Sequence, residues 1–212
     1  MGLQSGGVLS AKRFPPLSDG RVRIRAGIGT DANAVARLHV HAWQDSYRGI
    51  MPDDVLDNLD MDQRKRMWTG LMENPGQMYF YVAEVLPRPE EAATRKPVVA
   101  GVISGGPPRQ YGQAFPTTIY ALYVEPKVHR RGLGKRLLLR GFQHVLDDGH
   151  NAVALAVLED NTEAIRFYEA MGGERVGYTY GVLANTAVRT ALYGWSDVKS
   201  VMGLHQLVAE SS

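Results

Sequence analysis

The chain has 212 residues, of which 44% are hydrophobic, and its formal net charge at pH 7 is +2. These values fit one domain with a full hydrophobic core, and the small net charge argues against a dominant nucleic-acid-binding surface. The sequence contains no cysteine, which excludes disulfide bonds, thiolate metal sites and a cysteine nucleophile.

The N-terminal half alternates between short strand patterns and helix patterns. Pro52, followed by two aspartates, indicates the start of one of the helices. The predicted elements are a strand at 22–26, a helix from about Thr30 with Thr30 as its N-cap, a helix from about 52, a helix at 62–72, and strands at 78–85 and 96–106 separated by a charged loop at 86–95.

The second half continues this alternation and ends with two β patterns. The predicted elements are a strand at 117–124, a helix at 134–148, a strand at 151–158, a helix at 162–171, and strands at 175–183 and 187–195. This order predicts an α/β or α+β chain with one buried sheet.

The sequence shows no pattern typical of a membrane span or of a signal peptide. No apolar run reaches the roughly 18 residues needed to span a bilayer, and the first residues lack the apolar stretch of a signal peptide. We therefore expect a cytoplasmic protein. Residues 1–20, rich in Gly, Ser and Pro, are predicted to form a flexible N-terminal tail, and residues 199–212 a C-terminal tail.

The segment VHRRGLGKRLL, residues 128–138, connects a predicted strand to a predicted helix. A helix N-terminus presents unpaired backbone N–H groups, and Gly132 and Gly134 would let an anion approach them without interference from a Cβ. The surrounding cations are Arg130, Arg131 and Lys135. The pattern predicts a phosphate-binding turn, and the alternative is a glycine turn followed by a solvated basic helix.

The turn matches neither of two familiar nucleotide motifs. A P-loop needs Ser or Thr after its lysine, and Lys135 is followed by Arg136; a dinucleotide fingerprint needs a third glycine where Leu137 stands.

A second pattern, in LEDNTEAIRFYEAMGG at 158–173, places Asn161 after a strand and Tyr168 seven residues later on the same helix face.

Together the two patterns resemble the GNAT superfamily of acyl-CoA-dependent N-acetyltransferases. That family has Gln or Arg, two residues, Gly, any residue, then Gly or Ala, and positions 129–134 here read HRRGLG. Its later pattern is met by Asn161, Ala164, Tyr168 and Gly172. The resemblance covers residues 21–198 and implies a single GNAT-like domain whose mixed, mostly antiparallel central sheet is flanked by helices on both faces.

The resemblance also implies a role for each matched position, with acetyl-CoA as the acyl donor and no metal. Asn161 would touch the pantetheine arm and Tyr168 would face the thioester sulfur, although an N-cap and a core aromatic are the ordinary alternatives. Backbone groups would bind the acetyl carbonyl and pantetheine at Leu122 and Val124, and the pyrophosphate at Arg130, Arg131, Gly132, Gly134 and Lys135.

The implied reaction is acetyl transfer to a primary amine, of a small molecule or a protein. Without cysteine, the amine should attack the thioester directly in a ternary complex. Thr118 stands where many members have a glutamate base, so we expect a low-pKa amine or a base elsewhere. The other departures from the family pattern are His129 and Gly173. The candidate bases elsewhere are Glu125, His39, His41 and Asp45. Each of them can equally be a surface carboxylate or a helix histidine with a structural partner.

The acceptor site and the partners are less constrained. Trp43, Tyr47 and Gly49 would border the acceptor cleft, and the acids that follow could attract a cationic amine or cap helices: Asp53, Asp54, Asp57, Asp60 and Asp62. A non-catalytic acyl-CoA-binding or regulatory module is the main alternative, favoured by Thr118. A nucleic-acid-binding domain using the basic run 127–140 is another, although that run lacks interleaved aromatics. A homodimer is compatible with the sequence, and no membrane partner is expected.

Overall fold

The structure is a computed structural model that describes residues 21–109, 114–183 and 186–210. The tail predicted for residues 1–20 lies outside the described residues. No helix within the described ranges is long and apolar enough to cross a membrane.

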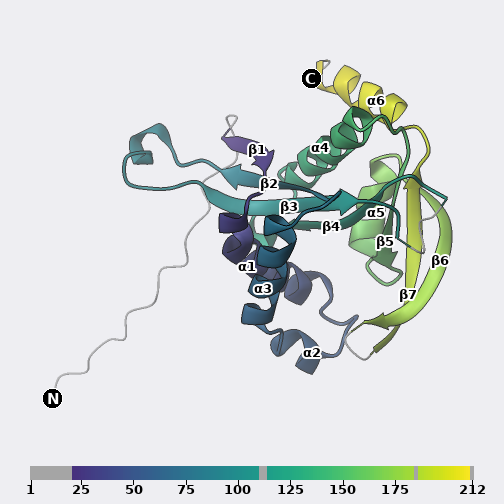
Figure 1. Ribbon diagram of the computed structural model, residues 1–212, viewed down its shortest axis with the longest axis horizontal. Coiled ribbons are helices and arrows are strands. Elements are labelled where there is room, and N and C mark those ends of the chain that lie inside the picture. Colours follow the sequence, from purple (N-terminus) through teal and green to yellow (C-terminus); the bar gives the residue numbers. More distant parts are fainter. Residues whose placement is uncertain (1–20, 110–113, 184–185, 211–212) are drawn as a thin grey trace.

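Seven strands form one sheet in the order β1-β2-β3-β4-β5-β7-β6 (Figure 1). Neighbouring strands are antiparallel except β4 and β5, which are parallel, so the mixed, mostly antiparallel sheet is confirmed. The strands are β1 (Val22–Ala26), β2 (Tyr79–Val85), β3 (Val98–Gly106), β4 (Thr118–Val124), β5 (Val153–Leu158), β6 (Glu174–Leu183) and β7 (Thr186–Trp195).

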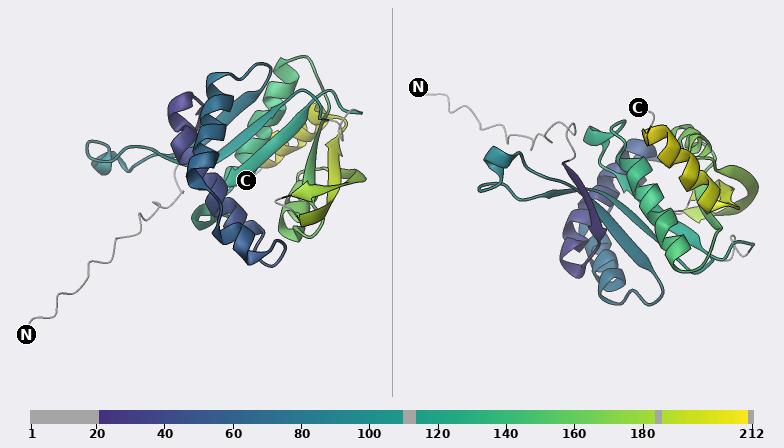
Figure 2. Two further views of the ribbon diagram at one scale, coloured as in Figure 1. Left: turned by 60° about the horizontal axis from the view of Figure 1, so that its bottom comes forward. Right: turned by 90° about the horizontal axis from the view of Figure 1, so that it is seen from above.

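Helices cover both faces of the sheet, as Figure 2 shows for α1 and α3 on one face and α4 and α6 on the other. Successive side chains of a strand point to opposite faces, and Tyr79 and Tyr81 of β2 pack with α4, whereas Phe80 and Val82 pack with α1 and α3. The helices are α1 (Ala32–Ser46), α2 (Asp53–Asp57), α3 (Met61–Glu73), α4 (Leu133–Asp147), α5 (Thr162–Ala170) and α6 (Val198–Glu210).

Helix α1 begins later than predicted, and Thr30 is not its N-cap. Residues Gly29–Asp31 form a 3-10 turn, and Asp31 occupies the N-cap position. The Asp31 carboxylate accepts hydrogen bonds from Arg25 at 2.7 and 2.8 Å and from the Ile28 N–H at 3.0 Å. An ion pair with Arg25 of β1, six residues earlier, thus holds the residue at which α1 starts.

Most of the segment predicted as the C-terminal tail, 199–212, lies in helix α6 (Val198–Glu210). Val198 is buried, and Val201 and Met202 pack against the same core as α4. Apolar residues at i, i+3 and i+4 are the pattern that lets a helix cover a core. The domain boundary at residue 198 stays a prediction.

Gly173, another departure from the family pattern, lies against Trp195. A Cβ at Gly173 would lie 2.7 Å from Cζ2 of the Trp195 ring. The indole Nε1 donates a hydrogen bond to the Met171 carbonyl at 2.9 Å, which holds the ring in that place. The large side chain on β7 thus takes the volume that a side chain at position 173 would need.

Candidate active site

The site begins where the parallel strands β4 and β5 separate. They pair at Thr118 with Ala154 and at Ile119 with Leu155, and over the rest of their described lengths they are not paired with each other. Backbone N–H and C=O groups left without a neighbouring strand need other partners. The open side of β4 can therefore bind an extended ligand in the way that it would bind a strand.

Two adjoining cavities, of about 130 Å³ and about 670 Å³, lie along this opening. They form one cleft, because both are lined by Leu122, Tyr123, Asn161 and Tyr168. The larger cavity runs to the N-terminus of α4, and the smaller one runs toward the C-terminal end of α1. Val124 lines the larger cavity.

The turn before α4 presents a row of backbone amides to the larger cavity. Gly132 is the N-cap residue and has φ 78°, and Arg130 has φ 59°. The N–H of Arg136 bonds to the Gly132 carbonyl and is the first to bond within the helix. The N–H groups before it, at Leu133, Gly134 and Lys135, have no partner within the helix and can bind a ligand. Left-handed residues beside a helix N-terminus create a concave, electropositive surface suited to phosphate oxygens.

Four of the five predicted cofactor-binding residues on this turn line the larger cavity. Arg130, Gly132, Gly134 and Lys135 line the larger cavity, whereas Arg131 does not. The Arg130 guanidinium bonds to Glu163 at 3.1 Å, and its side chain is 85% exposed. Lys135 is therefore the side chain of this turn that lies best to face an added phosphate.

The basic run 127–140 is not one free cationic face. Arg136 Nη2 donates to the Val22 carbonyl at 3.0 Å. Arg140 donates to the Tyr81 hydroxyl at 2.8 Å and lies 4.0 Å from the centroid of its ring. These arginines join α4 to β1 and β2, which weakens the nucleic-acid-binding alternative.

His129, the departure from the family pattern, has a local role. Its Nε2 lies 3.0 Å from the Val124 carbonyl oxygen, so Nε2–H is the donor and the ring closes the turn after β4. His129 also lines the larger cavity. His129 therefore supplies a side-chain hydrogen-bond donor at this position.

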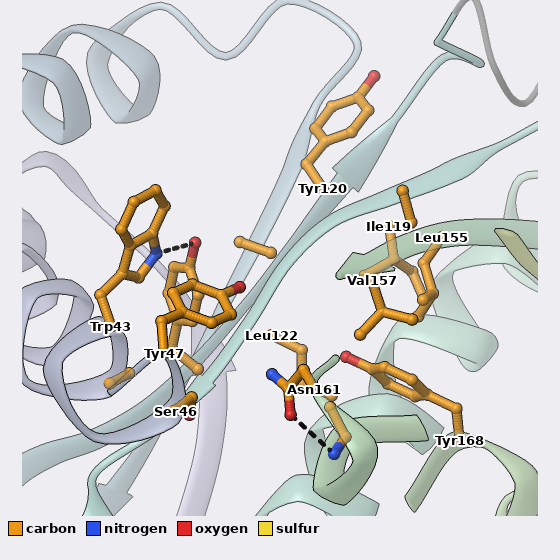
Figure 3. Close-up of a pocket in the computed structure, with 15 residues that line it drawn as sticks. Trp43, Ser46, Tyr47, Ile119, Tyr120, Leu122, Leu155, Val157, Asn161 and Tyr168 are labelled. Atoms are coloured by element: carbon orange, nitrogen blue, oxygen red, sulfur yellow. Dashed lines mark hydrogen bonds between the residues drawn. The ribbon is translucent and has the colours of Figure 1, made fainter. Parts of the chain in front are cut away.

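Asn161 combines the two roles that the sequence left open. It is the N-cap of α5, and its Oδ1 accepts a hydrogen bond from the Ala164 N–H at 3.1 Å. It also lines both cavities, and its side-chain nitrogen is turned away from α5 (Figure 3). Capping fixes the amide, which leaves its NH₂ group to donate to a ligand.

Tyr168 is likewise both packed and directed at the cleft. Its ring contacts Trp195 edge-on, with centroids 6.1 Å apart, and its side chain is buried. The hydroxyl points into the space between Leu122, Asn161 and Val157 (Figure 3). Burial raises the pKa of Tyr168 well above its usual value, and the neighbouring Tyr123 adds to the rise. Tyr168 is therefore a neutral phenol at physiological pH, able to donate a proton or a hydrogen bond.

The smaller cavity has aromatic walls. Trp43 and Tyr47 line it as predicted, and Gly49 does not. Tyr120 and Tyr123 of β4 also line it, although sequence reasoning assigned them no role. The Trp43 Nε1 donates to the Tyr123 hydroxyl at 3.0 Å, which ties α1 to β4 across the cavity (Figure 3).

None of the candidate bases lines either cavity: Glu125, His39, His41 and Asp45. His41 Nδ1 lies 3.1 Å from Glu125, outside the cleft. His39 is buried and accepts a hydrogen bond from Trp68 Nε1 at 3.1 Å. Burial, together with a smaller contribution from the Arg64 charge, lowers the pKa of His39 to about 3. His39 is thus a neutral core residue.

The residue in place of the usual glutamate, Thr118, is fully buried and does not line the cleft. Its Oγ1 accepts a hydrogen bond from the Arg109 backbone N–H at 3.3 Å. Thr118 therefore supports the segment that follows β3. No group of three or more His, Asp or Glu side chains in the described ranges could hold a metal ion.

Three of the five aspartates after α1 have structural partners, and none of the five lines the cleft. Arg48 bonds to Asp53 at 2.9 Å and to Asp57 at 2.7 Å. Asp60 caps α3 by accepting from the Gln63 N–H at 2.9 Å. These contacts favour the helix-capping and ion-pair interpretation over attraction of a cationic amine.

The chain is similar to known acetyltransferases. A family profile described as "Acetyltransferase (GNAT) family" matches residues 37–173. The Bacillus subtilis protein YuaI, described as an uncharacterized N-acetyltransferase, is 27% identical over 183 residues, which cover 86% of this chain and 98% of YuaI.

Solved structures share the fold. PaiA N-acetyltransferase from Thermoplasma acidophilum, in complex with coenzyme A, has a TM-score of 0.59 at 16% identity and covers 80% of this chain and 97% of its own. YncA from Salmonella typhimurium, a putative acetyltransferase with acetyl-CoA, has a TM-score of 0.58 at 19% identity and covers 84% and 94%.

The sheet, the amide-lined turn and the open side of β4 define an acyltransferase that uses an acyl-CoA donor. The chain belongs to the GNAT family of acetyltransferases, because the family profile matches more than half of its length.

Proposed function

We propose that this protein transfers the acetyl group of acetyl-CoA to a primary amine by direct attack in a ternary complex. The observation that carries the proposal is the single cleft with two different ends. Backbone amides of the turn before α4 line one end, aromatic side chains line the other, and Tyr168 lies between them.

The residues along the cleft fit acetyl-CoA in order. Amides of residues 130–135 would hold the pyrophosphate, and Lys135 would face a phosphate. Asn161 Nδ2 would donate to a pantetheine carbonyl. The open backbone of β4, at Leu122 and Val124, would pair with the pantetheine arm and the acetyl carbonyl, where an N–H group would stabilise the developing oxyanion.

The chemistry follows from the groups that reach the thioester. The amine nitrogen would form a bond to the acetyl carbon, and the carbon–sulfur bond would break to release the CoA thiolate. Tyr168 would donate a hydrogen bond to that thiolate, since its raised pKa keeps its proton in place. Direct attack is favoured because the sequence has no cysteine to form an acyl-enzyme.

A non-catalytic acyl-CoA-binding module is the second candidate. The observation that favours it is the lack of any acidic or histidine side chain among the residues that line the smaller cavity. Such a module would bind acetyl-CoA and release no CoA with any amine. Turnover with one amine would exclude it.

Acetyl-CoA is expected to raise the melting temperature of the protein, because a ligand that binds only the native state stabilises it by mass action. At about 100 times the Kd the stabilisation is about 2.7 kcal/mol, which for a chain of this size corresponds to roughly 5–10 °C. Differential scanning fluorimetry with increasing acetyl-CoA measures the shift.

Dephospho-CoA is the matched ligand, since it lacks only the 3′-phosphate that a cation of the α4 turn would contact. It should protect less than CoA at equal concentration. An unchanged melting temperature at millimolar acetyl-CoA would contradict acyl-CoA binding in this cleft.

A further inference from the structure

The smaller cavity contains no formal charge among the residues that line it. Its walls come largely from four aromatic side chains, Trp43, Tyr47, Tyr120 and Tyr123, with the Tyr168 hydroxyl at the inner end. The two internal segments outside the described residues, 110–113 and 184–185, contain no acidic or basic residue in the sequence. No carboxylate of the cavity is therefore available to pair with an ammonium ion or to take its proton.

The tyrosines cannot replace the missing carboxylate. Burial raises the pKa of Tyr47, of Tyr123 and of Tyr120 above their usual value, so each stays protonated at neutral pH. A neutral phenol can donate a hydrogen bond but does not neutralise a buried positive charge. An alkylammonium ion in this cavity would meet no carboxylate among the lining residues, and the cation–π attraction of the Tyr120 and Trp43 rings is already used by two arginines.

Two arginines lie over aromatic rings that line this cavity. Arg109 lies 4.3 Å from the centroid of the Tyr120 ring, and Arg64 lies 5.4 Å from that of Trp43. Within the described part of the chain, neither guanidinium has a carboxylate within salt-bridge distance. Like charges repel across a poorly solvated site, so both arginines disfavour a cationic acceptor.

The size of the cavity adds a constraint on shape. Its volume of about 130 Å³ is close to the roughly 150 Å³ of an apolar protein cavity that accepts benzene. Trp43 and Tyr47 meet edge to face, at 80° and 5.2 Å between centroids, so they offer two surfaces at right angles. A single planar ring can contact one face and one edge of such a pair.

We infer that the acceptor is an arylamine, an amine carried on a planar ring and uncharged at neutral pH. This inference rests on the proposed function. The nitrogen lone pair forms the bond to the acetyl carbon while the carbon–sulfur bond breaks. The N–H proton leaves with the thiolate, so the products are an N-arylacetamide and the CoA thiol. Because the nitrogen arrives neutral, the step needs no carboxylate to deprotonate it beforehand.

Two isomeric amines test the inference, 4-methylaniline and benzylamine, which share one formula and nearly one size. The first is neutral at pH 7, and the second is an alkylammonium ion. A lysine-type amine is neutral in only about one molecule in 10³ at pH 7. The lower intrinsic nucleophilicity of an arylamine offsets part of that difference. We expect kcat/KM at pH 7 to favour 4-methylaniline by at least about tenfold, measured by CoA release and by product mass.

A charge reversal gives a second readout on the same pair. Arg109→Glu should raise kcat/KM for benzylamine relative to 4-methylaniline by several-fold, because it replaces the positive charge at the Tyr120 ring with a negative one. Arg88→Glu is the matched control. Arg88 lies in the β2–β3 connection, which projects away from the sheet (Figure 1), so that variant should leave the ratio unchanged.

The outcomes separate the inference from the function. A preference for benzylamine at pH 7, or turnover of alkylamines alone, would overturn the arylamine inference and leave acetyl transfer standing. An unchanged ratio in Arg109→Glu would remove the electrostatic argument. Absence of CoA release with every amine, together with no stabilisation by acetyl-CoA, would overturn the proposed function and the inference with it.

Discussion

Replacing Tyr168 with phenylalanine is expected to lower kcat by about 10²-fold, the lower end of the range for general acid-base assistance. The variant keeps the ring that packs on Trp195 and loses only the hydroxyl that points into the cleft. A hydrogen bond made mainly to the leaving thiolate stabilises the transition state more than the bound substrate. The affinity for acetyl-CoA should therefore hardly change, as calorimetry would show.

Tyr79→Phe is the matched control for this change. Tyr79 is also buried, its hydroxyl has no hydrogen-bond partner in the described structure, and it lines neither cavity. Its loss should leave kcat unchanged. Full turnover by Tyr168→Phe, under conditions where chemistry is rate-limiting, would make Tyr168 a core aromatic without a catalytic role.

Gly132→Val is expected to weaken CoA binding by at least about tenfold, because Gly132 lines the larger cavity and the added side chain would crowd the pyrophosphate. The left-handed backbone separately costs a bulky residue of order 1–3 kcal/mol of folding stability. No protein atom lies within 4 Å of the added Cβ, so any loss of CoA affinity would come from contact with the ligand and not from a clash within the protein. Arg136→Ala should have a far smaller effect, because Arg136 bonds to Val22 and does not line the cleft. Isothermal titration with CoA measures both.

Gly149→Val separates backbone strain from loss of the ligand site. Gly149 has φ +79°, close to the +78° of Gly132, and likewise no atom within 4 Å of an added Cβ, but it lies at the other end of α4. Both variants should lower the melting temperature to a similar extent, and only Gly132→Val should lose CoA affinity. Equal CoA affinities for wild type and Gly132→Val would place the cofactor elsewhere.

The sequence was most informative where one short segment determines the structure. The glycine turn before α4 and the Asn161 cap of α5 are local patterns, and the structure brings both to one cleft. The strand and helix order was also predictable, because hydrophobic periodicity is a local signal. Tyr168 could be placed on the cleft-facing side of its helix for the same reason.

Features that depend on contacts between distant segments could not be read in this way. The β4 and β5 strands pair over two residue pairs before they separate, and no hydrophobic pattern encodes that length. The positions of Arg64 and Arg109 over aromatic rings of the cleft depend on how α3 and the segment after β3 pack. The sequence shows that Thr118 replaces the usual glutamate base. Only the structure shows that the other candidate bases also lie outside the cleft.

The most direct test of the central claim is a screen of amines with acetyl-CoA and the purified full-length protein. Free CoA is scored against a protein-only blank, and each active amine is checked by mass spectrometry for one added acetyl group. The account predicts stoichiometric CoA release and acetylated amine, with arylamines ahead of alkylamines at neutral pH. Binding of acetyl-CoA without release above the blank, across alkylamines, arylamines and peptide N-termini, would contradict it.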